Sequence, residues 1–420
     1  TATYELTNED GTSYTPSYNG SGTKVVRSSA ALSKFKEVRV DNTTVDSSNY
    51  TLTEGSTIVT FKESYLKTLS IGEHTLKIIS NDGFAIGKIT IEKPLTAAQT
   101  ITKLYNNSTK TTTTVNSVTY NLAASVGLMN DRKGSMSTNI DAGNIRYYGA
   151  SPNNYIYFNC SDYSNQSSST CELWRIIGVF DGKVKIMRSE SIGGYSWDTS
   201  LTNEYGVNDW SKATLMKLLN SGYESEKAGG SLYWNAKPGN CYYDYEGTTK
   251  ACDFTSTGLK NDTTRNLISE VIYYINGFDT NSVYANEAYN KERKSETIVS
   301  GHATEWRGKI TVPYLSDYAY AADLSLCQKT LPDYNDNACY SNNWMSNRYY
   351  YGLSYSEMWL LTPGSDSAGA CCVLNNYGNV GTNTASNCMD ILPTLFLNTE
   401  IRLDETTTGT STDPYKLIID

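Results

Sequence analysis

Residues 171–187 read Cys171-Glu172-Leu173-Trp174-Arg175-Ile176-Ile177-Gly178-Val179, then Phe180 and Asp181-Gly182, then Lys183-Val184-Lys185-Ile186-Met187. The first run is short and apolar, which predicts a buried strand. Asp-Gly between two such runs is a strong short-range signal for a two-residue hairpin turn. We therefore predict a β-hairpin here, within a region of mixed helix and strand that runs from about residue 120 to residue 420.

Two short helices are expected in the same region. Asp209 or Ser211 is placed to cap the first helix, and Asp262 or Thr263 is placed to begin the second. The apolar face of the first holds Leu215, Leu218 and Leu219. The apolar residues of the second are Leu267, Val271 and Ile275, with Ile268 and Ile272 beside them. The remainder, 276–420, is expected to be rich in loops.

The first 95 residues predict an all-β domain. Short strands are expected around 38–40 and at 57–61, 75–79 and 88–91, with Gly72 and Asn81-Asp82-Gly83 between them. Regular turns between strands with a period of two are typical of a β-sandwich. The Thr- and Asn-rich stretch 96–119 then predicts a linker by its composition.

The same region resembles the immunoglobulin-like X2 modules of bacterial secreted and cell-wall proteins. The likeness runs from Phe35-Lys36-Glu37-Val38 through Ser48-Asn49-Tyr50-Thr51 and Thr57-Ile58-Val59-Thr60 to His74-Thr75-Leu76. It implies a spacer or a weak binding module and not a catalyst. His74 is then expected at the start of a strand, with a structural role.

Composition excludes several classes of function. The 420 residues include 35 Lys and Arg against 44 Asp and Glu, a net charge of −9, so we expect no nucleic-acid partner. No apolar run approaches the roughly 18 residues that span a membrane, so we expect no membrane insertion within this chain. Only His74 and His302 are histidines, which argues against a His-based triad or a multi-His metal site. The 34 tyrosines suit wet recognition surfaces.

Six of the nine cysteines form closely spaced pairs, with turn-forming residues between the partners. The spacing is 11 or 12 positions and never CxxC, so local disulfides are favoured over zinc. Disulfides indicate an oxidising, extracellular compartment. We expect a bacterial cell-surface location, with any leader and anchor outside this chain. The predicted bridges are Cys160–Cys171, Cys241–Cys252 and Cys327–Cys339.

The C-terminal part resembles C-type-lectin-fold domains of the formylglycine-generating-enzyme type. The strand Trp359-Leu360-Leu361-Thr362-Pro363-Gly364 leads into a polar stretch that closes on Leu392-Pro393-Thr394-Leu395-Phe396-Leu397. The family's usual G-V-R-P is replaced by Asp390-Ile391-Leu392-Pro393. The same layout occurs in the variable proteins of diversity-generating retroelements. Related bacterial surface domains share the blocks Asn144–Ala150, Asn154–Cys160 and Cys171–Gly178. The resemblance implies a fold class of α+β, an immunoglobulin-like sandwich followed by a loop-rich C-type-lectin-like domain over 120–420.

Residues 365–388 are the predicted variable region and binding loop. In the variable proteins, diversity is targeted to adenines, chiefly in Asn codons. Each of these 24 residues can arise from an Asn codon by changing its adenines, and five are still Asn. A fixed binding loop or a plain structural loop is the alternative. The ligand-binding candidates are Ser365, Asp366, Ser367, Ala370, Cys371, Cys372, Leu374, Asn375, Asn376, Tyr377, Asn379, Thr382, Asn383, Thr384, Ser386, Asn387 and Cys388.

Two further features adjoin this region. Cys388 has Cys371 and Cys372 as alternative bridge partners, between which the sequence does not choose. An aromatic cluster precedes the region and is interpreted either as packing or as the rim of the binding face. The rim candidates are Trp344, Tyr349, Tyr350 and Tyr351.

Enzyme chemistry is weighed and set below binding. The formylglycine-generating enzymes use a cysteine pair with copper, but no supporting motif surrounds Cys371 and Cys372. Glu287 and Glu292 could serve a glycosidase, although nothing in the sequence fixes their separation. No catalytic residue and no metal ligand are assigned. No cofactor is expected, with a structural calcium ion left open; the acidic turn 333–336 reads more readily as a solvated loop.

The functional expectation is an extracellular, adhesin-like protein that binds a ligand without catalysis. The ligand would be a protein or a glycan on a host, bacterial or phage surface. Two alternatives stay open: a carbohydrate-binding or carbohydrate-cleaving surface protein, and a phage receptor-binding protein.

Overall fold

Strands dominate the computed structural model, with 36% of residues in strands and 15% in helices. The structure describes residues 1–199, 204–277, 283–294, 300–346, 357–364, 369–374 and 378–419. The expected α+β class is therefore wrong, because strand residues outnumber helical residues in the second unit as well and its helices are short. The chain divides into two units, Thr1–Leu95 and Thr96–Asp420.

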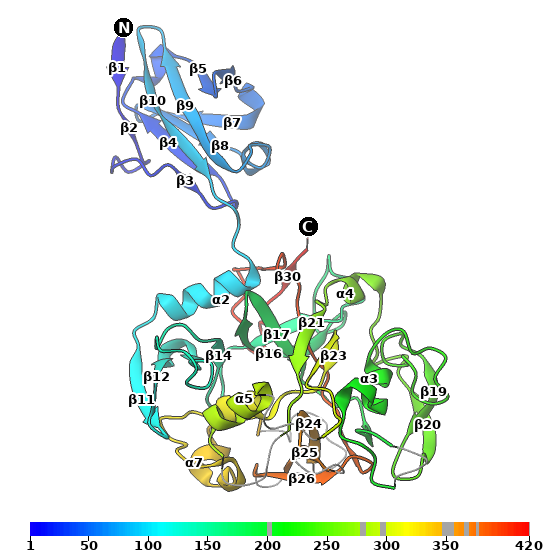
Figure 1. Cartoon of the computed structure of the whole chain (residues 1–420). Helices are drawn as coiled ribbons and strands as arrows, with labels where there is room; N and C mark the ends of the chain where they lie inside the picture. Colours follow the sequence, from blue (N-terminus) through cyan, green and yellow to red (C-terminus); the bar gives the residue numbers. More distant parts are fainter. Residues whose placement is uncertain are drawn as a thin grey trace. The chain divides into compact units, whose positions relative to one another are not determined.

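The first unit contains two sheets around one apolar core (Figure 1). Its strands are buried at alternate positions; in Thr57–Phe61 the side chains of Thr57, Val59 and Phe61 face inward. One sheet has the order β1 (Ala2–Tyr4), β10 (Gly83–Ile91), β9 (Gly72–Ser80), β5 (Phe35–Val40), β6 (Thr43–Thr44), with β3 (Ser17–Tyr18) paired to β10. The other has the order β2 (Leu6–Thr7), β4 (Lys24–Ser28), β8 (Thr57–Phe61), β7 (Tyr50–Thr53), and α1 (Glu63–Leu66) follows β8. The predicted strands are confirmed.

His74 occupies a structural position in β9. Its ring is buried, with Nδ1 2.6 Å from the Asp41 carboxylate and Nε2 2.6 Å from the Ser70 carbonyl oxygen. The hydrogen bonds to Ser70 and Asp41 raise the pKa of the His74 ring, despite its burial. The ring thus ties the start of β9 to the end of β5.

The second unit is built on a nine-stranded sheet. It includes the predicted hairpin, now β16 (Glu172–Phe180) and β17 (Lys183–Arg188), paired antiparallel. Asp181 and Gly182 both have positive φ, 47° and 74°, as a two-residue hairpin turn of this sequence requires. The order is β11 (Thr111–Val115), β12 (Val118–Ala123), β13 (Leu128–Asn130), β14 (Ile145–Tyr147), β16, β17, β28 (Thr394–Phe396), β23 (Ile310–Thr311), with β15 (Tyr155–Phe158) on β16.

The predicted linker is wrong. Residues 96–119 hold α2 (Ala97–Asn106), β11 and the start of β12. Thr96 and Gln99 form a capping box at the start of α2, and Ile101 and Tyr105 bury its inner face. The helix lies against β16 and β17 (Figure 1).

The second predicted helix is mostly wrong as well. Helix α4 covers only Asp262–Asn266, and Val271–Tyr274 forms strand β21, paired with β22 (Glu305–Gly308). β-branched and aromatic residues favour the strand once a partner is available, and that partner lies about thirty residues further on. The first predicted helix is confirmed as α3 (Thr214–Leu219), which buries Leu215, Leu218 and Leu219; Asp209 instead caps the 3₁₀ turn Trp210–Lys212.

A second, five-stranded sheet completes the scaffold. Its order is β18 (Gly194–Ser196), β27 (Cys388–Asp390), β24 (Glu357–Pro363), β25 (Gly369–Leu374), β26 (Val380–Thr384). Two further two-stranded sheets are β19 (Pro238–Tyr242) with β20 (Thr249–Asp253), and β29 (Arg402–Leu403) with β30 (Leu417–Ile418). The remaining helices are α5 (Ala285–Arg293), α6 (Leu315–Tyr320) and α7 (Asn337–Tyr340). Within this unit, α2 and β30 lie at one end and β24–β26 at the other (Figure 1).

The three predicted disulfides are present: Cys160–Cys171, Cys241–Cys252 and Cys327–Cys339. Each closes a short loop. Three such bridges fit a secreted or extracellular protein. Among the helices of the described ranges, none is long and apolar enough to cross a membrane.

Candidate functional site

The predicted binding loop is largely a pair of strands. Gly369–Leu374 is β25 and Val380–Thr384 is β26, and the two pair antiparallel with Cys371 opposite Thr382. The expectation of a loop is therefore wrong for these residues. β26 is the edge strand of the five-stranded sheet. Ala370, Cys371, Cys372 and Leu374 all lie on β25.

A buried strand holds this pair in place. In β24, the side chains from Met358 to Leu361 are at most 1% exposed. The indole nitrogen of Trp359 donates to the Tyr195 carbonyl oxygen at 2.9 Å. The indole nitrogen of Trp197 donates to the Leu360 carbonyl oxygen at 3.1 Å. Both faces of β24 are thus packed, and β25 pairs with a strand whose own position is fixed by buried contacts.

The start of β26 is anchored by tyrosines. The Tyr318 hydroxyl, on α6, donates to the carbonyl oxygen of Gly378. Gly378 has a φ of 74°, and an added Cβ would lie 2.8 Å from Tyr318 and from Tyr340. Only glycine fits this backbone position without strain.

The candidates that follow differ in exposure. Thr382 is exposed, whereas Asn379, Asn383, Thr384, Asn387 and Cys388 are half-buried. Ser386 is buried, as are its neighbours Ala385 and Val380. Asn383 donates to the Glu357 carboxylate at 3.1 Å and accepts from Asn387 at 2.5 Å. The segment therefore contains both framework residues and residues that solvent reaches.

Other candidates are placed elsewhere or lie outside the described residues. Trp344 is buried and its indole nitrogen donates to the Tyr147 carbonyl oxygen at 3.0 Å, so its assignment to an exposed rim is wrong. The candidates outside the described ranges are Tyr349, Tyr350, Tyr351, Ser365, Asp366, Ser367, Asn375, Asn376 and Tyr377.

Two segments far away in the sequence lie beside the turn 385–388. The Ser386 amide donates to the Tyr205 carbonyl oxygen at 3.1 Å. The Ser196 hydroxyl reaches the carbonyl oxygens of both Ser386, at 2.6 Å, and Asp244, at 3.4 Å. The tip of the β19–β20 hairpin and the segment around Tyr205 are thereby joined to the turn.

These segments expose tyrosines that the sequence analysis missed. Tyr205 is 49% exposed and Tyr245 is 53% exposed, and Glu246 beside Tyr245 is exposed as well. One signal in the sequence points to Tyr245. It belongs to the tyrosine-rich run Tyr242-Tyr243-Asp244-Tyr245, which lies between two bridged cysteines. We call the accessible residues of the three segments the site surface: Glu204, Tyr205, Tyr245, Glu246, Thr382 and Asn387.

Asp198 connects the parts beneath the site surface. Its carboxylate accepts from the amides of Val207, at 2.8 Å, and Thr214, at 3.0 Å. Its own amide donates to the Ala385 carbonyl oxygen at 3.0 Å. Burial raises the pKa of Asp198 to about 6, although the two amide donors act against this shift.

Cys388 is a free thiol. The side chains of its suggested bridge partners, Cys371 and Cys372, lie outside those that the structure describes. Burial raises the pKa of the Cys388 thiol to about 11. A thiol that stays protonated at neutral pH is a weak nucleophile. Its position therefore gives no support to cysteine-based oxidation at this residue.

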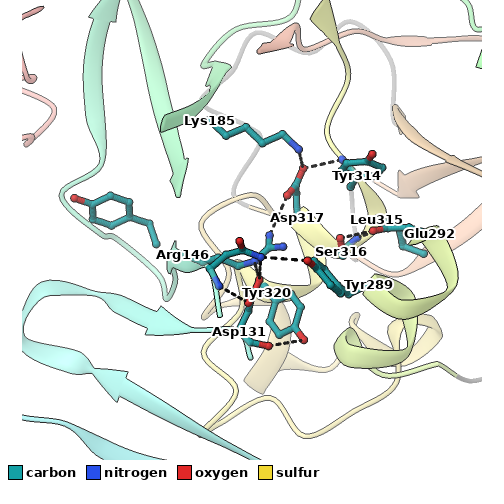
Figure 2. A network of polar contacts seen from close by, with 12 residues as sticks. Asp131, Arg146, Lys185, Tyr289, Glu292, Tyr314, Leu315, Ser316, Asp317 and Tyr320 are labelled. Carbon is teal, nitrogen blue, oxygen red and sulfur yellow. Dashed lines mark hydrogen bonds and ion pairs between the residues drawn. The ribbon is translucent and has the colours of Figure 1, made fainter. Parts of the chain in front are cut away.

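A second cluster of charged side chains lies in the core (Figure 2). The Asp317 carboxylate, on α6, pairs with Lys185 at 2.5 Å and with Arg146 at 2.9 Å. Arg146 also pairs with Asp131 at 2.6 Å, and its guanidinium lies over the ring of Tyr320 at 4.8 Å. Burial alone would raise the pKa of Asp317, but Lys185 and Arg146 hold it below its ordinary value.

Glu292 extends this cluster (Figure 2). Its carboxylate accepts from the Ser316 amide and hydroxyl, at 2.9 and 2.6 Å, and from the Thr362 hydroxyl, at 2.8 Å. It also pairs with Arg293 at 2.9 Å and is fully buried. Glu287, its suggested partner, accepts from the Tyr284 amide at the start of α5. Both carboxylates thus have structural partners, and Glu292 has no access to a substrate.

The acidic turn 333–336, interpreted above as a solvated loop in preference to a calcium site, leads into helix α7. The Asp336 carboxylate accepts from the Ala338 amide at 2.9 Å and caps α7. Among the described residues, no group of three or more His, Cys, Asp or Glu side chains is placed to hold a metal ion.

The Asp317 pairings predict a large stability effect. Asp317→Asn leaves two buried cations short of a counter-charge, so we expect a loss of about 3–5 kcal/mol in the free energy of unfolding. The exposed Asp333→Asn serves as the control and should change it by less than about 0.5 kcal/mol. Urea denaturation measures both, and equal midpoints would show that the pairings contribute nothing.

Asp198 predicts a pH dependence. Because its pKa is raised from 3.8 to about 6, the folded state binds the proton more tightly than the unfolded chain. This contribution is complete below pH 3.8 and is lost as the pH rises through about 6. Between pH 3.8 and about 6, the free energy of unfolding of the wild type should fall by up to about 3 kcal/mol relative to that of Asp198→Asn.

Denaturant titrations at several pH values test this difference. The control is Asp262→Asn, whose side chain is almost fully exposed. The free energy of unfolding of Asp262→Asn should change with pH as that of the wild type does. If Asp198→Asn also shows the pH dependence of the wild type, Asp198 is not the group responsible.

Comparisons of the chain with family models, with curated proteins and with solved structures find no match. What points to a function is therefore the geometry of the site surface and the chemistry of the residues there that solvent reaches.

Proposed function

We propose that this chain is an extracellular ligand-binding protein whose second unit recognises its ligand through the site surface. The observation that carries the proposal is the exposure of Tyr205 and Tyr245 beside the turn 385–388. Tyrosine supplies a large contact area with a polar tip and loses little conformational freedom on binding. Exposed tyrosines held on a fixed backbone are what a recognition surface requires.

The backbone under the site surface is held from below. Asp198 fixes the Val207 amide, Ser196 fixes two carbonyl oxygens, and Lys250 lies 3.8 Å from the Tyr243 ring centre. The Cys241–Cys252 bridge staples the hairpin that carries Tyr245. Little ordering is then needed when a ligand binds, which favours affinity.

The titratable groups favour binding without catalysis. Glu292 is saturated with hydrogen-bond donors in the core, and the Cys388 thiol stays protonated. The disulfides support an extracellular location, and we extend this to a bacterial cell surface, with a protein or glycan ligand presented by a host, another bacterium or a phage.

We further propose that part of the site surface is diversified. Residues 365–388 are all reachable from Asn codons by adenine changes, and Thr382 and Asn387 of this stretch are accessible. Val380 and Ala385 lie in the core beneath them. Diversity would thus be tolerated at some positions and removed by selection at others.

Substitution of the site-surface tyrosines should weaken ligand binding, whereas substitution of an exposed tyrosine elsewhere should not. Arrays of glycans and of extracellular proteins should contain a ligand whose binding falls about tenfold or more in Tyr205→Ala and in Tyr245→Ala. Tyr274→Ala removes a tyrosine that is 43% exposed on β21 and should leave binding unchanged. Melting temperatures should be equal in all four proteins. Equal losses of binding in the three variants would contradict the proposal.

Population sequencing tests diversification separately. Codons 355–400, read across a population of the source organism, should vary at adenine positions within 365–388. Variation should reach Thr382 and Asn387 and be absent at Val380 and Ala385, because changes there would disturb the core. An invariant stretch would show a fixed binding surface.

A further inference from the structure

A cavity of about 320 Å³ lies at the start of β16 and the end of β17, and no residue of the site surface lines it. Its wall includes Tyr157, Ser168, Glu172, Arg188, Glu190 and Ser411. The Cys160–Cys171 bridge closes the loop that carries Ser168, so this part of the wall is covalently fixed. A volume of this order suits a small molecule or one unit of a larger ligand.

Arg188 is held rigidly and still offers one donor. Its side chain is 7% exposed, with Nε donating to the Glu172 carboxylate at 3.0 Å. Nη1 donates to the carbonyl oxygens of Glu190, at 2.7 Å, and Ser191, at 3.2 Å. Nη2 has no acceptor within the part of the chain that the structure describes. A guanidinium donor without a protein acceptor, on a residue that lines a cavity, indicates a ligand that accepts a hydrogen bond.

Glu172 is also positioned from several sides. Asn159 donates to one carboxylate oxygen at 3.0 Å, and the Trp174 indole nitrogen donates to the other at 3.0 Å. Glu190, in contrast, is exposed at the cavity mouth. The wall thus presents one guanidinium and two carboxylates, together with the half-buried ring of Tyr157.

This charge balance selects the ligand class. An anion would meet two carboxylates against one guanidinium, and a cation would meet a guanidinium that cannot move away. An apolar ligand would desolvate charged groups without replacing their hydrogen bonds. A neutral polyhydroxylated ligand avoids these costs, since each hydroxyl both accepts and donates. A tyrosine ring suits the apolar face of such a ligand.

We propose that this cavity, which we call the glycan cavity, binds a neutral sugar unit. A hydroxyl of the sugar accepts from Arg188 Nη2, another donates to Glu190, and the ring lies against Tyr157. The site shares no residue with the site surface.

The test titrates the full chain with the methyl glycosides of glucose, galactose, mannose and N-acetylglucosamine, followed by saturation-transfer NMR. At least one should bind, and glucuronic acid should bind more weakly than glucose. Ser411→Trp fills the cavity and should weaken binding about tenfold or more. Thr412→Trp is the matched control, because Thr412 is the exposed neighbour in the same turn and is not part of the wall. It should change affinity by less than about twofold.

Two results overturn the inference: none of the four glycosides binds, or Ser411→Trp binds as well as Thr412→Trp. Glu190→Gln is a second test of sugar binding, because it keeps the volume of the side chain and removes the charge of the hydrogen-bond acceptor. It should weaken binding several-fold with an unchanged melting temperature. Glycoside binding that is lost in Tyr245→Ala and kept in Ser411→Trp would overturn the glycan cavity while supporting the site surface.

Discussion

Asp317 lies where two cations of the large sheet meet the first turn of α6. In a core that excludes water, Lys185 and Arg146 require a counter-charge, and Asp317 supplies it to both while also accepting from the Tyr314 amide. This pairing fixes α6 against the sheet. The next residue, Tyr318, then holds the carbonyl oxygen of Gly378 at the start of β26. The edge strand of the site surface therefore depends on a charge neutralised in the interior.

Local features of the fold were predictable from the sequence. Asp181-Gly182 specifies its own turn, and each disulfide joins cysteines 11 or 12 residues apart. Non-local pairing was not predictable. Val271–Tyr274 reads as a helix until Glu305–Gly308 supplies a strand partner. The capping box at Thr96 and Gln99 was readable, but the Thr-rich composition around it pointed to a linker.

The same division explains the candidate site. Residues 385–388 fall within the predicted stretch 365–388 because the resemblance covers the C-terminal segment. Tyr205 contacts this turn through a backbone hydrogen bond, and the hairpin that carries Tyr245 is joined to it through the Ser196 hydroxyl, both from distant segments. Trp344 was misplaced for the opposite reason. Its neighbours in sequence suggested an aromatic rim, whereas its indole nitrogen bonds the Tyr147 carbonyl oxygen across the core. Exposure is decided by tertiary contacts, which one sequence does not specify.

The two proposed recognition sites on the second unit differ in how far their residues also stabilise the fold. At the site surface, main-chain hydrogen bonds and buried neighbours such as Ala385 carry the fold, so the Tyr245 side chain can change without loss of stability. In the glycan cavity, Arg188 and Glu172 line the wall and also form a partly buried ion pair. A change there alters both the fold and the binding. Sequence variation is therefore compatible with the fold at the exposed positions of the proposed site surface, whereas substitution of Arg188 or Glu172 in the proposed glycan cavity would also disturb the fold.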